Sequence, residues 1–333
     1  MYDKCMISIR EKITKMFITG LDGDGLSLNK NLETLLNDGL GGVIFFTDNI
    51  KSVERFKKLI GDIKKYAKHP LFLSIDQEGG RVERTLNLYG GSKYKSASES
   101  AKLGENFTRE QTAQIAQELK SFGLNMNFAP VLDVNTNPNN PVIGTRSYSS
   151  NPEEVLKYGE ITAKTYLEHG IIPVGKHFPG HGDTSVDSHK SMPEVNLNFS
   201  ELERVHIYPF KMLINIPALM VSHVHYTCFD TEKIPASISE NVIKKYLRNT
   251  LNYNGLVISD DMVMGGIGGY SRLEACKRGI KAGINMFIFR SSDDETACLP
   301  ELLAKEVEAG KVDIADIEYS YRKICELTKR ISG

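Results

Sequence analysis

The feature of this sequence that most limits its possible folds is a regular alternation of short apolar runs and longer amphipathic stretches. Eight runs, bounded by Gly, Pro or Asp and followed by helically spaced residues, lie at 16–19, 42–46, 71–75, 124–129, 171–175, 218–222, 256–259 and 284–289. The runs are apolar on both faces, as parallel strands covered by helices are. Eight such units in 333 residues favour a single (β/α)8 TIM barrel over a doubly wound sheet.

The stretches between the runs predict helices. Their apolar residues recur at intervals of three and four in the ranges 53–67, 109–123, 151–170, 198–213 and 237–251, and a closing helix is expected at 313–331. Gly123 and Gly170 stand where two of these helices would end. Ser200, followed by Glu203, has the pattern of a capping box. Residues 86–100 contain many turn residues and no clear period, so we expect a loop there.

Composition excludes several classes of protein. The net charge of −1 argues against nucleic acid or an anionic membrane as a partner. The five cysteines are far apart and form no CxxC pair, which argues against a disulfide framework or a thiolate metal site. Residues 1–15 lack the apolar region of a secretion signal, and no apolar run approaches the ~20 residues that span a bilayer. We expect one domain over 1–333, in the cytoplasm.

Charged and polar side chains follow five of the eight runs. They are Asp76, Glu78 and Arg84 after the third run, Asp133 and Arg146 after the fourth, Lys176, His177, His181, Asp183, Asp187 and His189 after the fifth, His223 and His225 after the sixth, and Asp260 and Asp261 after the seventh. The carboxyl ends of barrel strands meet at one mouth, where barrel enzymes build their sites. Because burying an unpaired charge costs several kcal/mol, this concentration indicates a functional site.

Some of these residues also fit a structural role. Asp133 is equally consistent with a local cap or ion pair, and His225 and Asp261 with a supporting position behind the site. Neighbouring residues at a strand end point in opposite directions, so Glu78 and Asp261 are kept as alternates. Since the run before Asp260 is apolar on both faces, alternation alone does not decide between Asp260 and Asp261.

Four motifs carry a resemblance to a known family. They are KHFPGHGDTSVDSH at 176–189, IDQEGGRVER at 75–84, IGTRS at 143–147 and ISDDM at 258–262. In this order and spacing they resemble the bacterial β-N-acetylglucosaminidases of glycoside hydrolase family 3, which implies a retaining glycosidase. The glycine-rich segment 264–270 departs from that family's usual pattern, which bears on the loop beside the nucleophile and on aglycone preference.

The resemblance also implies roles for individual residues. Asp260 is the nucleophile, His189 the acid/base and Asp187 its carboxylate partner, while the sugar-binding residues are Asp76, Arg84, Arg146, Lys176 and His177, with His223 as a further candidate. The chemistry is consistent, because a retaining enzyme needs a carboxylate about 5 Å from a proton donor. An adjacent carboxylate favours a protonated imidazole. Nearby cations such as Lys176, Arg84 and Arg146 are expected to lower the pKa of Asp260.

The substrate implied by the resemblance is a cell-wall fragment in which GlcNAc is β-1,4 linked to a muramic acid residue, recycled in the cytoplasm by a monomer or weak homo-oligomer without cofactor or metal. We expect Gly180 and Gly182 to let the loop that bears His189 close over the sugar. Three alternatives stay open: a phosphorylase, glucosidase or xylosidase on the same scaffold; a metal-dependent hydrolase with ligands among His177, His181, Asp183, Asp187 and His189; and a non-catalytic sugar-binding protein.

Overall fold

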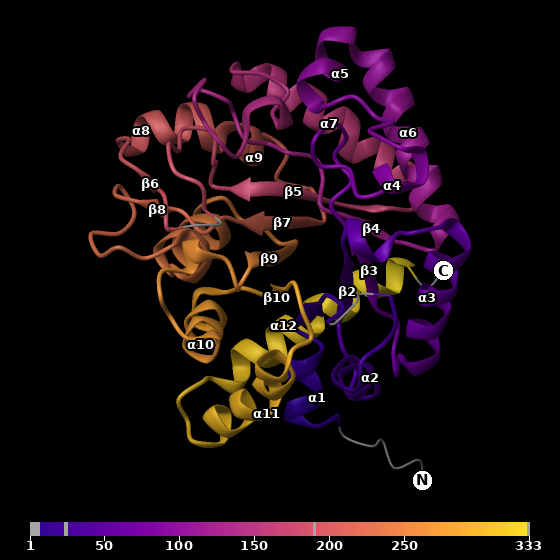
Figure 1. The fold of residues 1–333 in the computed structure, drawn as a ribbon. Helices are drawn as coiled ribbons and strands as arrows, with labels where there is room; N and C mark the ends of the chain where they lie inside the picture. The colour runs from indigo at the N-terminus through magenta and orange to yellow at the C-terminus, as the bar shows by residue number, and fades with distance from the viewer. Residues whose placement is uncertain (1–6, 23–25, 189–190, 332–333) are drawn as a thin grey trace.

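A computed structural model describes residues 7–22, 26–188 and 191–331, which form a closed barrel of parallel strands (Figure 1). The barrel strands are β1 (Phe17–Thr19), β2 (Gly42–Phe45), β3 (Phe72–Ile75), β4 (Met126–Asn127), β5 (Ile172–Phe178), β7 (Ala218–Val221), β9 (Leu256–Asp261) and β10 (Met286–Phe289). They pair in chain order, and β1 closes the barrel against β10. Each predicted run supplies one strand, which confirms the (β/α)8 barrel.

Helices surround this barrel (Figure 1). The longer ones are α1 (Ile9–Thr14), α2 (Lys30–Asn37), α3 (Val53–Tyr66), α5 (Ala97–Leu103), α6 (Glu105–Phe122), α7 (Pro152–Glu168), the π-helices η3 (Leu202–Ile207) and η5 (Asn241–Thr250), α10 (Arg272–Ala282), α11 (Asp294–Glu308) and α12 (Ile314–Thr328). Short segments are α4 (Leu86–Tyr89), α8 (Phe199–Glu201), α9 (Tyr208–Met212), η1 (Thr47–Asn49), η2 (Gly144–Arg146), η4 (Ala236–Ile238), η6 (Gly265–Ile267) and η7 (Lys329–Ile331). Strands β6 (Glu194–Val195) and β8 (His225–Tyr226) pair outside the barrel.

Two local predictions were wrong. The helical segment near 200 is capped by Asn198, whose side chain accepts from the N–H of Glu201, so Ser200 lies within α8 and caps nothing. Glu203 instead accepts from the hydroxyl of Tyr246, at 2.8 Å. The helix is capped two residues earlier than the sequence pattern indicates. This is possible because Asn is as good an N-cap as Ser.

The predicted loop at 86–100 contains helical structure. It holds α4, which ends at Gly90 with a φ of +68°, and the start of α5. Ser96 and Glu99 form a reciprocal capping box at the beginning of α5. Segments of four and seven residues are too short to show a clear helical period, which is why the sequence pattern missed them.

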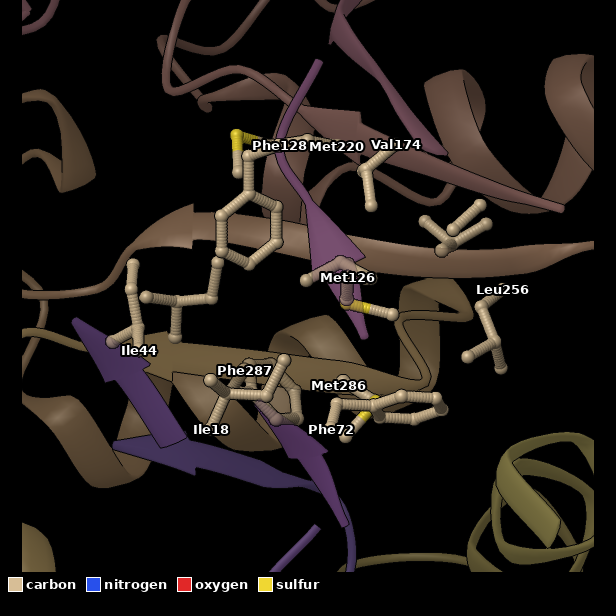
Figure 2. Packing of buried hydrophobic residues seen from close by; sticks show 14 of the residues in the cluster. Ile18, Ile44, Phe72, Met126, Phe128, Val174, Met220, Leu256, Met286 and Phe287 are labelled. Carbon is tan, nitrogen blue, oxygen red and sulfur yellow. The ribbon is translucent and has the colours of Figure 1, made fainter. Parts of the chain in front are cut away.

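Apolar side chains fill the interior of the barrel (Figure 2). Ile18, Phe72, Met126, Val174 and Met286 come from five different strands and are fully buried. Because these side chains close the lumen, the barrel is a packed core and not a channel. A substrate can therefore enter only at a mouth, and the strand-end residues described above stand at the carboxyl-terminal one.

Two strands carry one extra residue at that mouth. On β5, Gly175 pairs with Leu219 and Phe178 pairs with Val221, so the register shifts at residues 176–177. On β9, Ile258 pairs with Met286 and Asp261 pairs with Ile288, so the register shifts at residues 259–260. Such bulges interrupt the alternation of side chains and are frequent beside active sites. Two consecutive residues of each strand consequently face the mouth.

Within the described residues, no helix combines the length and the apolar character needed to cross a membrane. The described cysteines, Cys228, Cys276, Cys298 and Cys325, carry free thiols.

Candidate active site

A cavity of about 270 Å³ opens at the carboxyl-terminal mouth of the barrel. Its lining includes six of the predicted residues, Asp76, Arg84, Arg146, Lys176, His177 and Asp260, together with Asp261, His181, Ser188, Met264 and Arg290. These residues lie at or after the carboxyl ends of β3, β4, β5, β9 and β10, so five strands contribute to the site. Its small volume suits one sugar ring better than a chain of them.

Lys176 lies at the centre of a buried ion network. Its side chain is 1% exposed, and Nζ donates to Oδ1 of Asp76 at 2.7 Å and contacts Oε1 of Glu78 at 2.6 Å. Arg146 donates from Nε and Nη2 to the two oxygens of Glu78, at 2.9 and 2.8 Å. Burial opposes ionisation of Asp76 and Glu78, but these cations outweigh it and hold the pKa of both carboxyls below the usual range. Glu78, an alternate in the sequence, thus lies behind the cavity and fixes two of its cations.

Arg84 lies across the same cavity. Its Nη2 is 3.5 Å from Oδ2 of Asp76, and its guanidinium lies over the ring of Phe46. Its Nε is buried and finds no hydrogen-bond partner among the described residues. Because buried donors are normally paired, this nitrogen is suited to bind an oxygen of a ligand.

Asp133 fixes the histidine that follows Lys176. It is fully buried, and Oδ2 lies 2.6 Å from Nδ1 of His177. Its Oδ1 accepts from the backbone N–H of His181 at 2.7 Å. Burial opposes its ionisation, but interactions with His177 outweigh this and keep the pKa of Asp133 below its usual range. Asp133 therefore orients His177, whose ring lines the cavity, and has a supporting position itself.

His181 lines the cavity as well, although no feature of the sequence distinguishes it from the other histidines of its motif. Its Nδ1 lies 2.8 Å from the hydroxyl of Thr184, and its Nε2 lies 3.1 Å from the hydroxyl of Ser188. Burial lowers the pKa of His181 to about 4, so the ring is neutral at neutral pH. A neutral imidazole bonded to Ser188 links the floor of the site to the segment that bears Asp187.

The two aspartates at the end of β9 have different environments. Burial opposes ionisation of Asp260, but interactions with His177, His223 and the N–H of Asp261 outweigh it and lower the pKa of Asp260. Burial raises the pKa of Asp261, which binds Nε of Arg290 through Oδ2 at 2.7 Å. The bulge brings both residues to the cavity, so the expected opposite orientation does not hold here. Among the described residues, no cation is bonded to the carboxylate of Asp260, which is therefore suited to attack an electrophile.

The histidines after the sixth run do not line the cavity. His223 is fully buried, with Nδ1 2.6 Å from the hydroxyl of Ser237 and Nε2 3.0 Å from the carbonyl oxygen of Asp261. Both ring nitrogens are therefore engaged within the protein, and His223 supports the end of β9 through the carbonyl oxygen of Asp261. His225 lies on β8, with Nδ1 3.2 Å from the carbonyl oxygen of Ile234.

His189 lies outside the described residues, and Ser188 lines the cavity just before it in the chain. The carbonyl of Ser188 accepts from the N–H of Gly266, at 2.8 Å, so the glycine-rich segment contacts this loop. A Cβ on Gly182 would lie 1.7 Å from the carbonyl oxygen of Val134. Gly182 is therefore required by close approach of two backbones, whatever its role in loop motion.

Arg290 is a site residue that the sequence analysis missed. It follows β10 directly, so the rule that was applied to the other strand ends would have found it. No group of three His, Cys, Asp or Glu among the described residues is placed to hold a metal ion.

The chain matches the model of the glycosyl hydrolase family 3 N-terminal domain over residues 8–327. It is 34% identical over 280 residues to a β-hexosaminidase of Tolumonas auensis, covering 80% of this chain and 81% of that protein. It is 31% identical to β-hexosaminidase A of Pseudoalteromonas piscicida, covering 88% of this chain but only 54% of that longer protein. The fold and these matches define a glycoside hydrolase of the TIM-barrel class. The chain belongs to glycoside hydrolase family 3.

A solved structure agrees with this assignment. The family 3 β-N-acetylglucosaminidase of Paenibacillus sp. str. FPU-7 superposes with a TM-score of 0.91 at 32% identity. The match covers 98% of this chain and 63% of that one, so this chain is similar to the barrel part of a larger protein.

Proposed function

We propose that this protein is a retaining exo-β-N-acetylglucosaminidase that removes terminal β-linked GlcNAc through a covalent intermediate on Asp260. The observation that carries the proposal is the carboxylate of Asp260, kept ionised in a cavity sized for one sugar and faced by His177 and Lys176. The similarity to the β-hexosaminidases and the β-N-acetylglucosaminidase named above supports the choice of sugar.

The proposed first step is attack of an Asp260 oxygen on the anomeric carbon. A bond forms between Asp260 and the sugar, the bond from the anomeric carbon to the leaving oxygen breaks, and that oxygen takes a proton from His189. In the second step, water gives a proton to His189 and its oxygen displaces Asp260. Two displacements restore the β configuration. The proposed role of Asp187 is to hold the imidazole of His189 in the donating orientation.

The proposed sugar-binding residues are Asp76, Arg84, Arg146, Lys176 and His177. Their charged donors and acceptors suit the hydroxyl groups of a pyranose, and charge-assisted hydrogen bonds are stronger than neutral ones. The ion network around Lys176 keeps these groups in place before the sugar arrives, so little ordering remains for binding. His223, whose nitrogens are engaged within the protein, belongs to the proposal only as a support for β9.

The proposed substrate is a GlcNAc–muramic acid fragment of peptidoglycan, with or without a peptide, processed in the cytoplasm during cell-wall recycling. Release of GlcNAc from a purified disaccharide fragment, followed by mass spectrometry, tests the substrate. Cell fractionation tests the location.

One experiment tests the mechanism. The enzyme is incubated with a 5-fluoro β-N-acetylglucosaminyl fluoride, digested, and analysed for the labelled peptide, with Asp260→Asn and the neighbouring Asp261→Asn as matched variants. We expect label on the peptide containing residues 258–262, at Asp260, and none in Asp260→Asn. Label at another residue, or an α-configured first product by NMR, would contradict the proposal. Sugar 1-phosphate formed when phosphate is present would instead identify a phosphorylase.

A further inference from the structure

The aglycone side of the cavity carries a cation that the proposed chemistry does not use. Arg290 follows β10, and its backbone N–H and Nε donate to Oδ1 and Oδ2 of Asp261, at 3.2 and 2.7 Å. These two bonds fix the guanidinium at the rim of the cavity. The Nη1 and Nη2 atoms have no hydrogen-bond partner among the described residues, which leaves four N–H donors for a ligand.

The exposed fractions of the cations that line the cavity indicate which end holds the terminal sugar and which end holds the leaving group. The side chain of Lys176 is 1% exposed, that of Arg146 11%, that of Arg84 28% and that of Arg290 56%. The buried cations surround the closed end, where an exo-acting enzyme holds the terminal sugar. Arg290 is at the open end, where the group attached to that sugar must emerge.

The hydrogen-bond partners of these cations also differ between the closed end and the open end of the cavity. Lys176 and Arg146 are bonded to the buried carboxylates Asp76 and Glu78, so these two cations and two carboxylates compensate one another. Within the described part of the chain, Arg290 is bonded through Nε and its backbone N–H, both to Asp261, so the paired Nη atoms stay available to a ligand. A planar pair of N–H donors of this kind matches a carboxylate in bidentate geometry.

We infer that Arg290 is a specificity-determining residue that binds a carboxylate on the leaving group, so that the enzyme prefers substrates with an acidic aglycone. This inference rests on the proposed function and adds the chemical class of the group beyond the scissile bond. Asp261 is the positioning residue, since it holds the guanidinium plane. The carboxylate has two sources, an acidic substituent on the next sugar or the end of a peptide attached to it.

The test compares two leaving groups that differ only in charge. The β-N-acetylglucosaminides of 7-hydroxycoumarin-3-carboxylate and of its carboxamide are assayed with wild type, Arg290→Gln and Arg290→Lys. We expect Arg290→Gln to lose about tenfold more in kcat/KM on the carboxylate than on the carboxamide, because a hydrogen bond to a charged group is lost at a half-exposed site. The loss is expected in KM, since the contact is remote from the reacting bond. Arg290→Lys keeps the positive charge but lacks the planar pair of N–H donors, so its loss on the carboxylate should lie between those of wild type and Arg290→Gln.

Arg278→Gln is the matched control. Arg278 on α10 is also partly exposed and also holds a carboxylate, that of Glu274, through Nε at 3.0 Å. It does not line the cavity, so its loss should leave the ratio between the two substrates unchanged. Equal losses of Arg290→Gln on both substrates would overturn the inference, because Arg290 would then act only through Asp261. If wild type cleaved neither glycoside, the proposed function itself would fail. Cleavage of both glycosides with equal losses in Arg290→Gln would overturn only the inference about Arg290.

Two disaccharides separate the sources of the carboxylate. One has a free lactyl carboxylate on the leaving sugar, and in the other that acid is amidated by a dipeptide with a free carboxyl end. A defect of Arg290→Gln on the first alone assigns the sugar substituent, and a defect on the second alone assigns the peptide. A defect on neither would overturn the inference.

Discussion

Replacing Lys176 by methionine should destabilise the protein, because it removes a buried cation from the closed end of the cavity. Lys176 and Arg146 neutralise Asp76 and Glu78, and one ammonium contacts both carboxylates at 2.7 and 2.6 Å. The two carboxylates therefore lie within about 5 Å of each other, where their repulsion at an effective dielectric constant of about 20 is about 3 kcal/mol. Removing one partner of a buried pair generally costs about 3 to 5 kcal/mol. We expect Lys176→Met to lower the free energy of unfolding by this amount at pH 7.

The pH dependence separates charge from packing. In wild type the pKa values of Asp76 and Glu78 are lowered, so their contribution to stability is present above pH ~4 and is lost as the pH falls below that value. In Lys176→Met, Asp76 keeps only Arg84, at 3.5 Å, and Glu78 keeps only Arg146, so the two carboxylates share one cation fewer and take up a proton at higher pH than in wild type. The difference between the two proteins should consequently shrink between pH 7 and pH 4.

Urea unfolding at pH 7, 5 and 4 measures this difference. Lys157→Met is the matched control, because Lys157 pairs with Glu105 at the surface and should matter little. Adding Glu78→Gln to Lys176→Met should recover part of the loss at pH 7. A deficit that is the same at every pH, with no recovery in the double variant, would refute the electrostatic argument.

Three further outcomes are expected. Asp133→Asn should lower the free energy of unfolding by about 2 kcal/mol in urea titrations and reduce kcat/KM, because His177 loses a charged partner at 2.6 Å; full activity would contradict its orienting role. Gly182→Ala should destabilise by more than about 3 kcal/mol through its clash with Val134, whereas Gly61→Ala, with open space in α3, should stabilise by up to about 1 kcal/mol by thermal unfolding. Activity should survive EDTA; loss restored by Zn²⁺ would favour the metal-dependent alternative.

The barrel could be predicted from the sequence because the apolar runs that form its strands recur regularly along the chain. Runs that are apolar on both faces mark buried parallel strands, and all eight were found, each to within a few residues. The polar residues at their ends were predicted to converge, and Asp76, Lys176 and Asp260 do line one cavity. These predictions depend only on the pattern along the chain and on the rule that strand ends meet.

What the sequence missed depends on local exceptions to that pattern. The extra residues at 176–177 and 259–260 turn neighbouring side chains to the same side, and no residue type at these positions predicts a bulge. The role of Asp133 depends on a contact with His177 across 44 positions of the chain. Short helices such as α4 have too few residues to reveal a period.

The internal pairing of the cations at the closed end has a consequence for work in different buffers. A neutral sugar enters a subsite whose charges already compensate one another and are shielded from solvent, so its affinity should vary little with ionic strength. At the half-exposed rim, added salt screens the guanidinium of Arg290 and weakens attraction to an anion. Turnover of acidic and neutral glycosides should therefore converge as salt is raised.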